Sequence, residues 1–191
     1  MQLSFFSAEA RPPSVDDLEG LLAGPGQVVR RDGLARVSVV VAEPWRVDAL
    51  AAALADLGFE PETAPSSDGS GTTVRTPFSP ALLPLALRWT SGAVTLPPVG
   101  FVLDGRRLRW WALAAGRPDA GGYALGLGQN DDAAWSAVGA ALAAAGVPGT
   151  FLGPRADGPA YRVVGRRRLA RLRELVGDPP EGWPPEAWPR P

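Results

Sequence analysis

The chain has 191 residues, enough for one domain or two small halves, and a formal net charge of −1 with 46% hydrophobic residues. It has no cysteine and no histidine, and all of its basic residues are arginine. These absences exclude disulfides, thiolate nucleophiles and zinc–thiolate sites, and they remove histidine as a general base and lysine as a Schiff-base former.

Membrane insertion and secretion are not expected. No apolar run reaches the roughly 18 residues that cross a bilayer, and the N-terminus lacks the basic start and long apolar centre of a secretory signal. We therefore expect a cytoplasmic protein with no membrane contact, and the sequence predicts no cofactor.

Helical and strand patterns alternate along the first half. Asp16 or Asp17 is a candidate cap for its first helix, and Asp32-Gly33 is a strong hairpin signal. The predicted elements, in order, are a helix from about residue 18 to residue 24 or 26, strands at 27–31 and 35–42, a helix at 45–57, β structure around 71–76 and a helix at 79–89. The stretch 64–72 is rich in turn residues and is expected to be a loop.

The second half repeats this order in a weaker form. Asp104 and Gly105 precede a predicted helix over 107–115, which Gly116 and Pro118 end. The elements that follow are a strand at 122–129, a helix at 132–145, β structure at 150–153 and 160–164, and a helix at 166–176.

Three pairs of segments match in the same order, which indicates a duplication. LEGLLAGPG (18–26) matches LRWWALAAG (108–116), DALAAALADLGFEP (48–61) matches SAVGAALAAAGVPG (136–149), and VRTPFSPALLPLAL (74–87) matches YRVVGRRRLARLRE (161–174). Each unit reads as αββαββα. The predicted organisation is a first repeat over 1–96, a second over 97–177, and a Pro/Trp-rich tail over 178–191.

The tail should run as polyproline-type coil, because its prolines are incompatible with a helix or a central strand. Two interpretations are open for its aromatic residues. Trp183 and Trp188 either pack on the body of the protein or serve to recognise a partner.

The repeated helix of the form Leu-x-Gly-Leu-x-x-x-x-Gly, followed by a hairpin, a helix, strands and a helix, resembles the LAGLIDADG homing endonucleases. The resemblance covers about residues 16–176, and LEGLLAGPG matches the family motif at Leu18, Gly20, Leu21 and Gly26. The second copy matches at Leu108 and Gly116 only. The resemblance implies an α+β fold with pseudo-twofold symmetry, in which two central helices pack side by side and two curved antiparallel sheets form a saddle for duplex DNA.

The resemblance also implies a position for nuclease chemistry. In the family, an acidic residue just before the final glycine of each motif helix holds a divalent metal over the scissile phosphates. The matching residues here are Pro25 and Ala115, and neither can ligate a metal through its side chain. Glu19, Asp32 and Asp119 are poor substitutes, being distant along the helix or placed in turns. We therefore expect no enzyme activity, no catalytic residues and no metal site.

Arginines are the candidate DNA-binding residues. Arg36 shares one face of its strand with Ser38 and Val40, and Arg30 or Arg31 is expected beside it on the neighbouring strand. Arg75 and Arg162 occupy equivalent places in the two repeats. Arg166 and Arg167 begin the last helix, where they either contact phosphate or form a solvated face. Only small residues, Ala124, Gly126 and Gly128, lie opposite the apolar face of the second hairpin, so it offers no direct readout of bases.

The leading hypothesis is a catalytically silent LAGLIDADG-like protein that binds duplex DNA as a monomer with internal pseudo-twofold symmetry. A regulatory role is expected, because WhiA-type bacterial regulators carry a degenerate form of this module. The alternative is a protein-interaction module that kept the fold and lost DNA binding, using the smooth sheet face or the C-terminal tail. A surviving nuclease is the third possibility.

Overall fold

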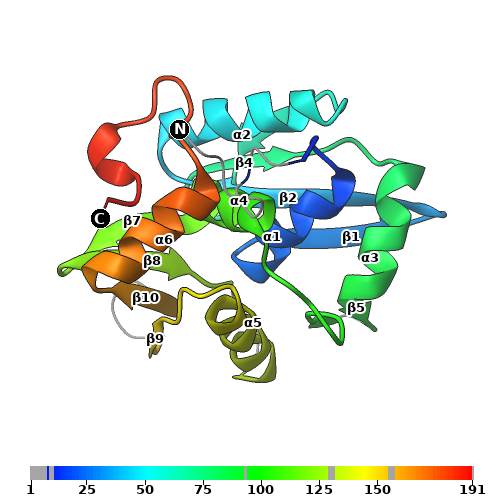
Figure 1. Ribbon diagram of the computed structural model, residues 1–191. Coiled ribbons are helices and arrows are strands. Elements are labelled where there is room, and N and C mark those ends of the chain that lie inside the picture. The colour runs from blue at the N-terminus through cyan, green and yellow to red at the C-terminus, as the bar shows by residue number, and fades with distance from the viewer. Residues whose placement is uncertain (1–7, 9–10, 93, 129–131, 155–157, 191) are drawn as a thin grey trace.

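Both repeats fold into a four-stranded antiparallel sheet, and the two sheets lie on either side of a central pair of helices (Figure 1). The computed structural model describes residues 8, 11–92, 94–128, 132–154 and 158–190. The strand order is β1-β2-β4-β3 in the first sheet and β7-β8-β10-β9 in the second. Because each repeat arranges its four strands in the same way, the predicted duplicated αββαββα fold is confirmed.

The first repeat starts with a 3-10 turn, Val15–Leu18, that continues directly into a short α-helix. Its elements are α1 (Glu19–Ala23), β1 (Gln27–Arg31), β2 (Leu34–Val41), α2 (Pro44–Asp56), β3 (Glu62–Pro65), β4 (Thr72–Arg75), a 3-10 turn at Pro80–Leu82 and α3 (Leu83–Trp89). Asp32 and Gly33 both have positive φ, at 51° and 76°, as the predicted tight hairpin turn requires.

The second repeat follows a small hairpin, β5 (Thr90–Ser91) and β6 (Val94–Thr95), and the connection over 96–104. Its elements are α4 (Gly105–Ala115), β7 (Gly116–Asp119), β8 (Gly122–Gly126), α5 (Asp132–Ala144), β9 (Thr150–Leu152), β10 (Ala160–Val164) and α6 (Arg166–Val176). Asp104 caps α4 by accepting a hydrogen bond from the Arg107 backbone N–H at 2.9 Å. The domain boundary at 96/97 stays a prediction.

Two details of the first repeat differ from the sequence prediction. Ser14, not Asp16 or Asp17, is the N-terminal cap, and the Asp17 carboxylate accepts a hydrogen bond from the Ser14 N–H at 2.8 Å, which completes a capping box. Residues 62–65 form the edge strand β3, although part of this stretch was predicted to be loop. Its side chains are largely exposed, so it lacks the apolar alternation by which a strand is recognised in sequence.

The two central helices, α1 and α4, approach each other at backbone distance. A Cβ atom at Gly20 would lie 1.9 Å from the carbonyl oxygen of Arg107, and one at Gly24 would lie 2.6 Å from the Trp111 ring. Only glycine fits at these two positions. This close contact confirms the expected side-by-side packing of the two motif helices.

An ion-pair network joins the same helices at their N-terminal ends. The nearly buried Glu19 carboxylate on α1 receives hydrogen bonds from Arg107 Nε on α4 at 2.8 Å and from Arg88 on α3 at 3.0 Å. Buried charges require partners of this kind. Glu19 therefore joins α1 to α4 and α3 through ion pairs.

The strands alternate between a core face and an outer face. On β2, Ala35, Val37, Val39 and Val41 are buried, whereas Arg36, Ser38 and Val40 are partly or fully exposed. The helices α2 and α3 cover the core face of the first sheet, and α5 and α6 cover that of the second, so that all buried faces join in one core. We call the uncovered side of each sheet its outer face.

The C-terminal tail packs on the body of the protein through its tryptophans. Trp183 and Trp188 are buried, with Trp183 edge-on to Trp45 of α2 at a centroid distance of 4.2 Å. The Trp188 indole N–H donates to the Gly177 carbonyl at 2.9 Å. The tail thus reaches from the second repeat to the first. It also contains a short 3-10 turn, Pro185–Ala187, where only coil was predicted. Among the described residues no helix is long and apolar enough to cross a bilayer.

We predict that Gly20→Ala lowers the free energy of unfolding by about 3 kcal/mol, because the new methyl group overlaps the Arg107 backbone. Helix propensity alone predicts the opposite sign, a gain of about 1 kcal/mol. Urea unfolding measures the difference. Gly153→Ala is the control, since a Cβ atom there meets nothing within 4 Å. A stabilised Gly20→Ala protein would contradict the packing.

We predict that stability falls as the pH rises above about 10, the pKa of a tyrosine in an unfolded chain. Burial raises the pKa of Tyr123 and of Tyr161, the only two tyrosines. A group whose pKa is raised by folding stabilises the protein at pH values below its pKa in the unfolded chain. This stability is lost as the pH rises from the pKa of the unfolded chain to the pKa of the folded protein. Absorbance at alkaline pH should show that both phenols ionise at a higher pH in the folded protein than in the unfolded chain. Tyr123→Phe should reduce the alkaline loss of stability.

Candidate nucleic-acid interface

The outer face of the first sheet presents Arg31 and Arg36 together. Arg36 on β2 faces Val29 on β1, and Arg31 faces Leu34, so both side chains project from the outer face. Their guanidinium groups lie over the Phe78 ring at 4.4 and 4.5 Å from its centroid. This cation–π contact orders two long side chains while it leaves their donors available.

Arg30 lies on the other side of the same strand. It pairs with Ala35, whose side chain is fully buried on the core face. Of the two residues expected beside Arg36, the structure therefore selects Arg31, because neighbouring residues of a strand point to opposite faces.

Arg166 and Arg167 also lie away from the outer face. They begin α6, whose Leu169, Leu172 and Val176 pack into the core and cover the core face of the second sheet. Both arginines are exposed on the helical side of the molecule. A duplex held on the two outer faces would not reach them directly.

Arg75 and Arg162 occupy equivalent rows of the two outer faces, as their alignment predicted. The first row is Gln27, Ser38, Arg75 and Glu62, and the second is Arg117, Ala124, Arg162 and Thr150. Arg75 is neutralised by Glu62, with its Nε 2.8 Å from the carboxylate. Arg162 faces Thr150 instead, and its nearest carboxylate is that of Asp119 at 3.8 Å.

Arg117 is a candidate that the sequence reading missed. It lies on β7 directly opposite Ala124, on the same face as Arg162. Within the described part of the chain its guanidinium makes no ion pair or hydrogen bond. The repeat itself carried the signal, because the offset that aligns Gly26 with Gly116 also aligns Gln27 with Arg117.

The smooth face predicted for the second hairpin is not an open surface. Ala124 and Gly126 are buried, although both belong to the outer face of β8. Arg117 and Arg162 project on either side of Ala124, so the row presents guanidinium groups to solvent. Residue 128 follows the strand, outside β8.

A cavity of about 380 Å³ lies where the C-terminal ends of the two central helices meet the sheets. Pro25 and Ala115 line it together, as expected for equivalent positions beside the pseudo-twofold axis. Val40 and Gly126, one from each outer face, also line it, so the cavity opens on the side of the molecule that carries Arg36 and Arg117. We call this space the axis cavity.

Arg46 forms the wall of the axis cavity and holds the end of α4. Its guanidinium, 6% exposed, donates to the carbonyl oxygens of Ala112, Leu113 and Gly116 at 3.2, 2.8 and 2.5 Å. Its Nε donates to Glu43 at 3.0 Å. A cation at a helix C-terminus satisfies carbonyls that have no partner within the helix. Burial lowers the pKa of Arg46, and the nearby Arg117 acts in the same direction.

The residues around the axis cavity do not fit a divalent metal ion. Pro25 and Ala115 offer no ligating atom in their side chains, and Glu43 is the one carboxylate in the lining. That carboxylate is already held by Arg46. In the described ranges no three His, Cys, Asp or Glu side chains gather closely enough to bind a metal. Asp32 and Asp119 lie instead at the hairpin turns β1–β2 and β7–β8.

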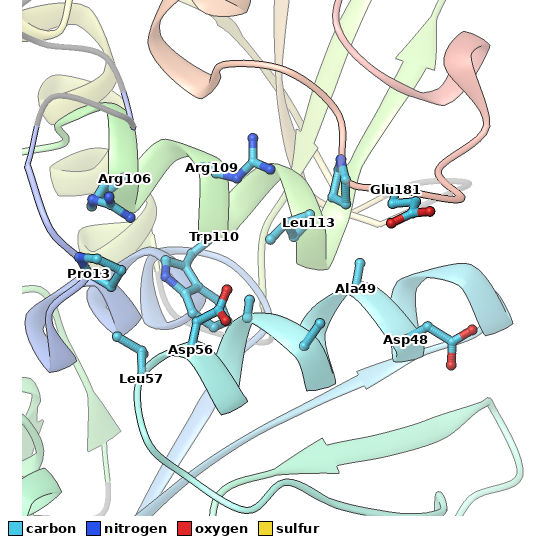
Figure 2. A pocket seen from close by; sticks show the side chains of 13 residues that line it. Pro13, Asp48, Ala49, Asp56, Leu57, Arg106, Arg109, Trp110, Leu113 and Glu181 are labelled. Carbon is cyan, nitrogen blue, oxygen red and sulfur yellow. The ribbon is translucent and has the colours of Figure 1, made fainter.

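A second, larger cavity of about 530 Å³ lies on the helical side, between α2, α4 and the start of the tail (Figure 2). Asp48 and Asp56 of α2 and Glu181 of the tail stand around it, with Trp110 and Leu113 of α4 opposite. Its arginines are engaged with the backbone: Arg106 Nε donates to the Arg11 carbonyl at 2.7 Å and Arg109 to the Val176 carbonyl at 2.8 Å. None of the residues that line this cavity belongs to a strand of either sheet.

Comparison with solved structures defines the class of fold. The homing endonuclease I-WcaI bound to its DNA recognition sequence matches with a TM-score of 0.60 and 10% identity, covering 85% of this chain and 81% of that chain. Mesophilic variants of the homing endonuclease I-DmoI match at 0.49 and 13% identity over 85% of this chain and 96% of that chain. I-DmoI in complex with DNA and Mn matches at 0.48 and 12% identity, over 86% and 99%. No family model and no curated protein sequence matches the chain.

The molecule is thus a pseudo-symmetric α+β protein in which two four-stranded sheets lie on either side of a central pair of helices. Its fold is that of the LAGLIDADG homing endonucleases, as the resemblance in sequence indicated. This finding contradicts the prediction that the chain is not an enzyme. The solved neighbour I-WcaI is a homing endonuclease, and the replacement of two acidic residues by Pro25 and Ala115 does not demonstrate a loss of activity.

We predict that Arg46→Met lowers the free energy of unfolding by roughly 3 kcal/mol, because the carbonyls at the end of α4 and the Glu43 carboxylate lose their donor. The stability of Arg46→Lys should lie between those of the wild-type protein and Arg46→Met, since one ammonium group cannot reproduce the forked contacts of a guanidinium. Thermal and urea unfolding measure these effects. Arg168→Met, at an exposed site on α6, should change stability by less than about 0.5 kcal/mol. An equal loss in both Met variants would contradict the role of Arg46.

Proposed function

We propose that this protein binds duplex DNA along the outer faces of its two sheets, with the axis of the molecule over the centre of the site. The observation that carries the proposal is the distribution of charge on these faces. Five arginines from both repeats, namely Arg31, Arg36, Arg75, Arg117 and Arg162, project from the outer faces, and the carboxylates beside them among the described residues are Asp32, Glu62 and Asp119.

Physical chemistry supports the match between this surface and a duplex. A two-stranded β-ribbon fits the major groove, and arginine binds phosphates and pairs its two donors with guanine. Arg36 and Arg31 extend from the hairpin β1–β2, and Arg117 and Arg162 extend from the equivalent part of the second sheet. The solved neighbour I-WcaI is described bound to its DNA recognition sequence. The regulatory role expected from the sequence stays a prediction.

The protein-interaction alternative has less support. Its two predicted surfaces were the smooth face of the second hairpin and the C-terminal tail. Ala124 and Gly126 of β8 are buried, with Ala124 between Arg117 and Arg162, and Trp183 and Trp188 are buried against the body. Neither surface presents the exposed aromatic or apolar anchors on which protein interfaces depend.

We predict that Arg36→Gln combined with Arg162→Gln, one residue from each sheet, weakens binding of a mixed-sequence duplex by tenfold or more. Each lost phosphate contact should also reduce the slope of log affinity against log salt by roughly 0.9. Fluorescence anisotropy at about 50 and 200 mM salt measures both quantities.

The matched control is Arg166→Gln with Arg167→Gln, which changes the net charge equally on the exposed helical side. It should leave the salt slope nearly unchanged. Equal losses from the two double variants would show that binding does not follow the outer faces. No binding of the wild-type protein at low salt would refute the proposed function.

Cleavage is measured separately. Supercoiled plasmid and the same labelled duplex are incubated with the protein and Mg²⁺ or Mn²⁺. Nicked or linear product that scales with protein concentration, and that disappears in the Arg36 and Arg162 double variant, would extend the proposed function from binding to hydrolysis.

A further inference from the structure

The axis cavity combines a position on the DNA-facing side with an unusual lining. Val40 of β2 and Gly126 of β8 occupy equivalent places in the two repeats, and both open into it. Pro25 and Ala115 close it where the central helices end. A duplex that lies on both outer faces passes over this opening, so the charges in the cavity decide which part of the nucleic acid it accepts.

The charges in the cavity are one ion pair and one guanidinium without a partner. Glu43 and Arg46 neutralise each other, and Arg46 is committed to the carbonyls of α4. Arg117 is half-buried and has neither a carboxylate nor a carbonyl partner among the described residues. The lining therefore carries a net positive charge in a partly desolvated place, where electrostatic interactions are stronger than in water.

Gly126 supplies the space beside this guanidinium. A Cβ atom at that position would lie 3.1 Å from the Ala115 Cβ and 3.5 Å from Arg117 Nη1. The glycine, together with the small side chain of Ala115, leaves room next to the donors of Arg117. The cavity of about 380 Å³ is large enough for a tetrahedral anion with several waters.

We propose that the axis cavity is an anion site, in which Arg117 binds a phosphate group directly and no divalent cation lies between them. This inference rests on the proposed function, because the phosphate that reaches the cavity is taken to be one of the DNA backbone. A phosphate that accepts hydrogen bonds from the Arg117 guanidinium would compensate the net positive charge of the lining. A metal ion would be repelled by Arg117 and would find one carboxylate already paired.

The first test uses inorganic phosphate alone and needs no DNA. Phosphate should raise the melting temperature of the wild-type protein more than chloride does at equal ionic strength, because it binds the folded state. Arg117→Gln should abolish this extra shift. Arg168→Gln, which removes the same charge from the exposed side of α6, should keep it. An equal shift in all three proteins would overturn the anion site.

The second test asks whether DNA supplies the phosphate. Arg117→Gln should weaken duplex binding about tenfold, the loss expected for one charge-assisted hydrogen bond, both in EDTA and in Mg²⁺ at equal ionic strength. Wild-type affinity should not rise when Mg²⁺ or Mn²⁺ is added. A rise that Glu43→Gln removes would mean that the cavity is a cation site, and the proposal would be wrong.

The two tests separate the proposal from the proposed function. If the wild-type protein binds no duplex, the proposed function fails and the phosphate titration alone decides whether the cavity binds anions. If duplex is bound but Arg117→Gln leaves both the affinity and the phosphate shift unchanged, the proposed function stands and the anion site is refuted.

Discussion

The contact between the two central helices fixes every other relation in the molecule. Gly20 of α1 lies against the backbone of Arg107 on α4, at a distance that no larger residue permits. Each helix leads into the first strand of its own sheet after a short turn or none, so the helix contact also sets the distance and orientation of the two sheets. A surface that extends over both sheets needs such a rigid centre, because a small rotation at the helix contact would displace the outer strands by a larger distance.

Oriented charges reinforce this centre at both ends. At the N-terminal end, Glu19 is held between Arg107 and Arg88, and at the C-terminal end Arg46 of the first repeat satisfies the last carbonyls of α4 in the second. Both groups link residues from different repeats. Such buried charges stabilise only in the geometry that satisfies them, since an unpaired buried charge costs several kcal/mol. They therefore favour one relative placement of the two repeats over others that apolar contact alone would permit.

The sequence predicted the architecture well because its signals were local and repeated. The Asp32-Gly33 turn, the Asp104 cap and the helical spacing of α6 each depend on a few neighbouring residues. The exposed edge strand β3 was missed because it buries almost nothing and so leaves no alternation to detect. The Ser14 cap was missed because several polar residues in a row can satisfy the same helix terminus, and only geometry selects one.

The candidate interface was predicted less completely, because the face on which an arginine lies depends on strand register. Arg31 and Arg30 are neighbours in sequence, and pairing with Leu34 and Ala35 places them on opposite sides of the sheet. Sequence alone does not distinguish Arg166 and Arg167 from the arginines on the strands. The helix that carries them, α6, covers the core face of the second sheet, opposite to its outer face. Arg117 is not predicted by the sequence pattern because it lies on β7, whose four residues, GRPD, show no strand alternation.

The two outer faces are related by symmetry in backbone and differ in charge. Arg75 is neutralised by Glu62, whereas Arg162 faces Thr150 and Arg117 has no counterpart among the first-sheet arginines, since its equivalent is Gln27. The first face therefore relies on Arg31 and Arg36 at its outer hairpin, and the second concentrates its uncompensated charge near the axis. A duplex is itself nearly symmetric in backbone charge, so this distribution would place the strongest phosphate contacts on one side of the centre. Because the backbone charge is nearly the same in both orientations of a duplex, phosphate contacts alone select no direction. A preferred direction would require that the hairpin carrying Arg36 reads bases, since the two orientations of an asymmetric site present different bases to it.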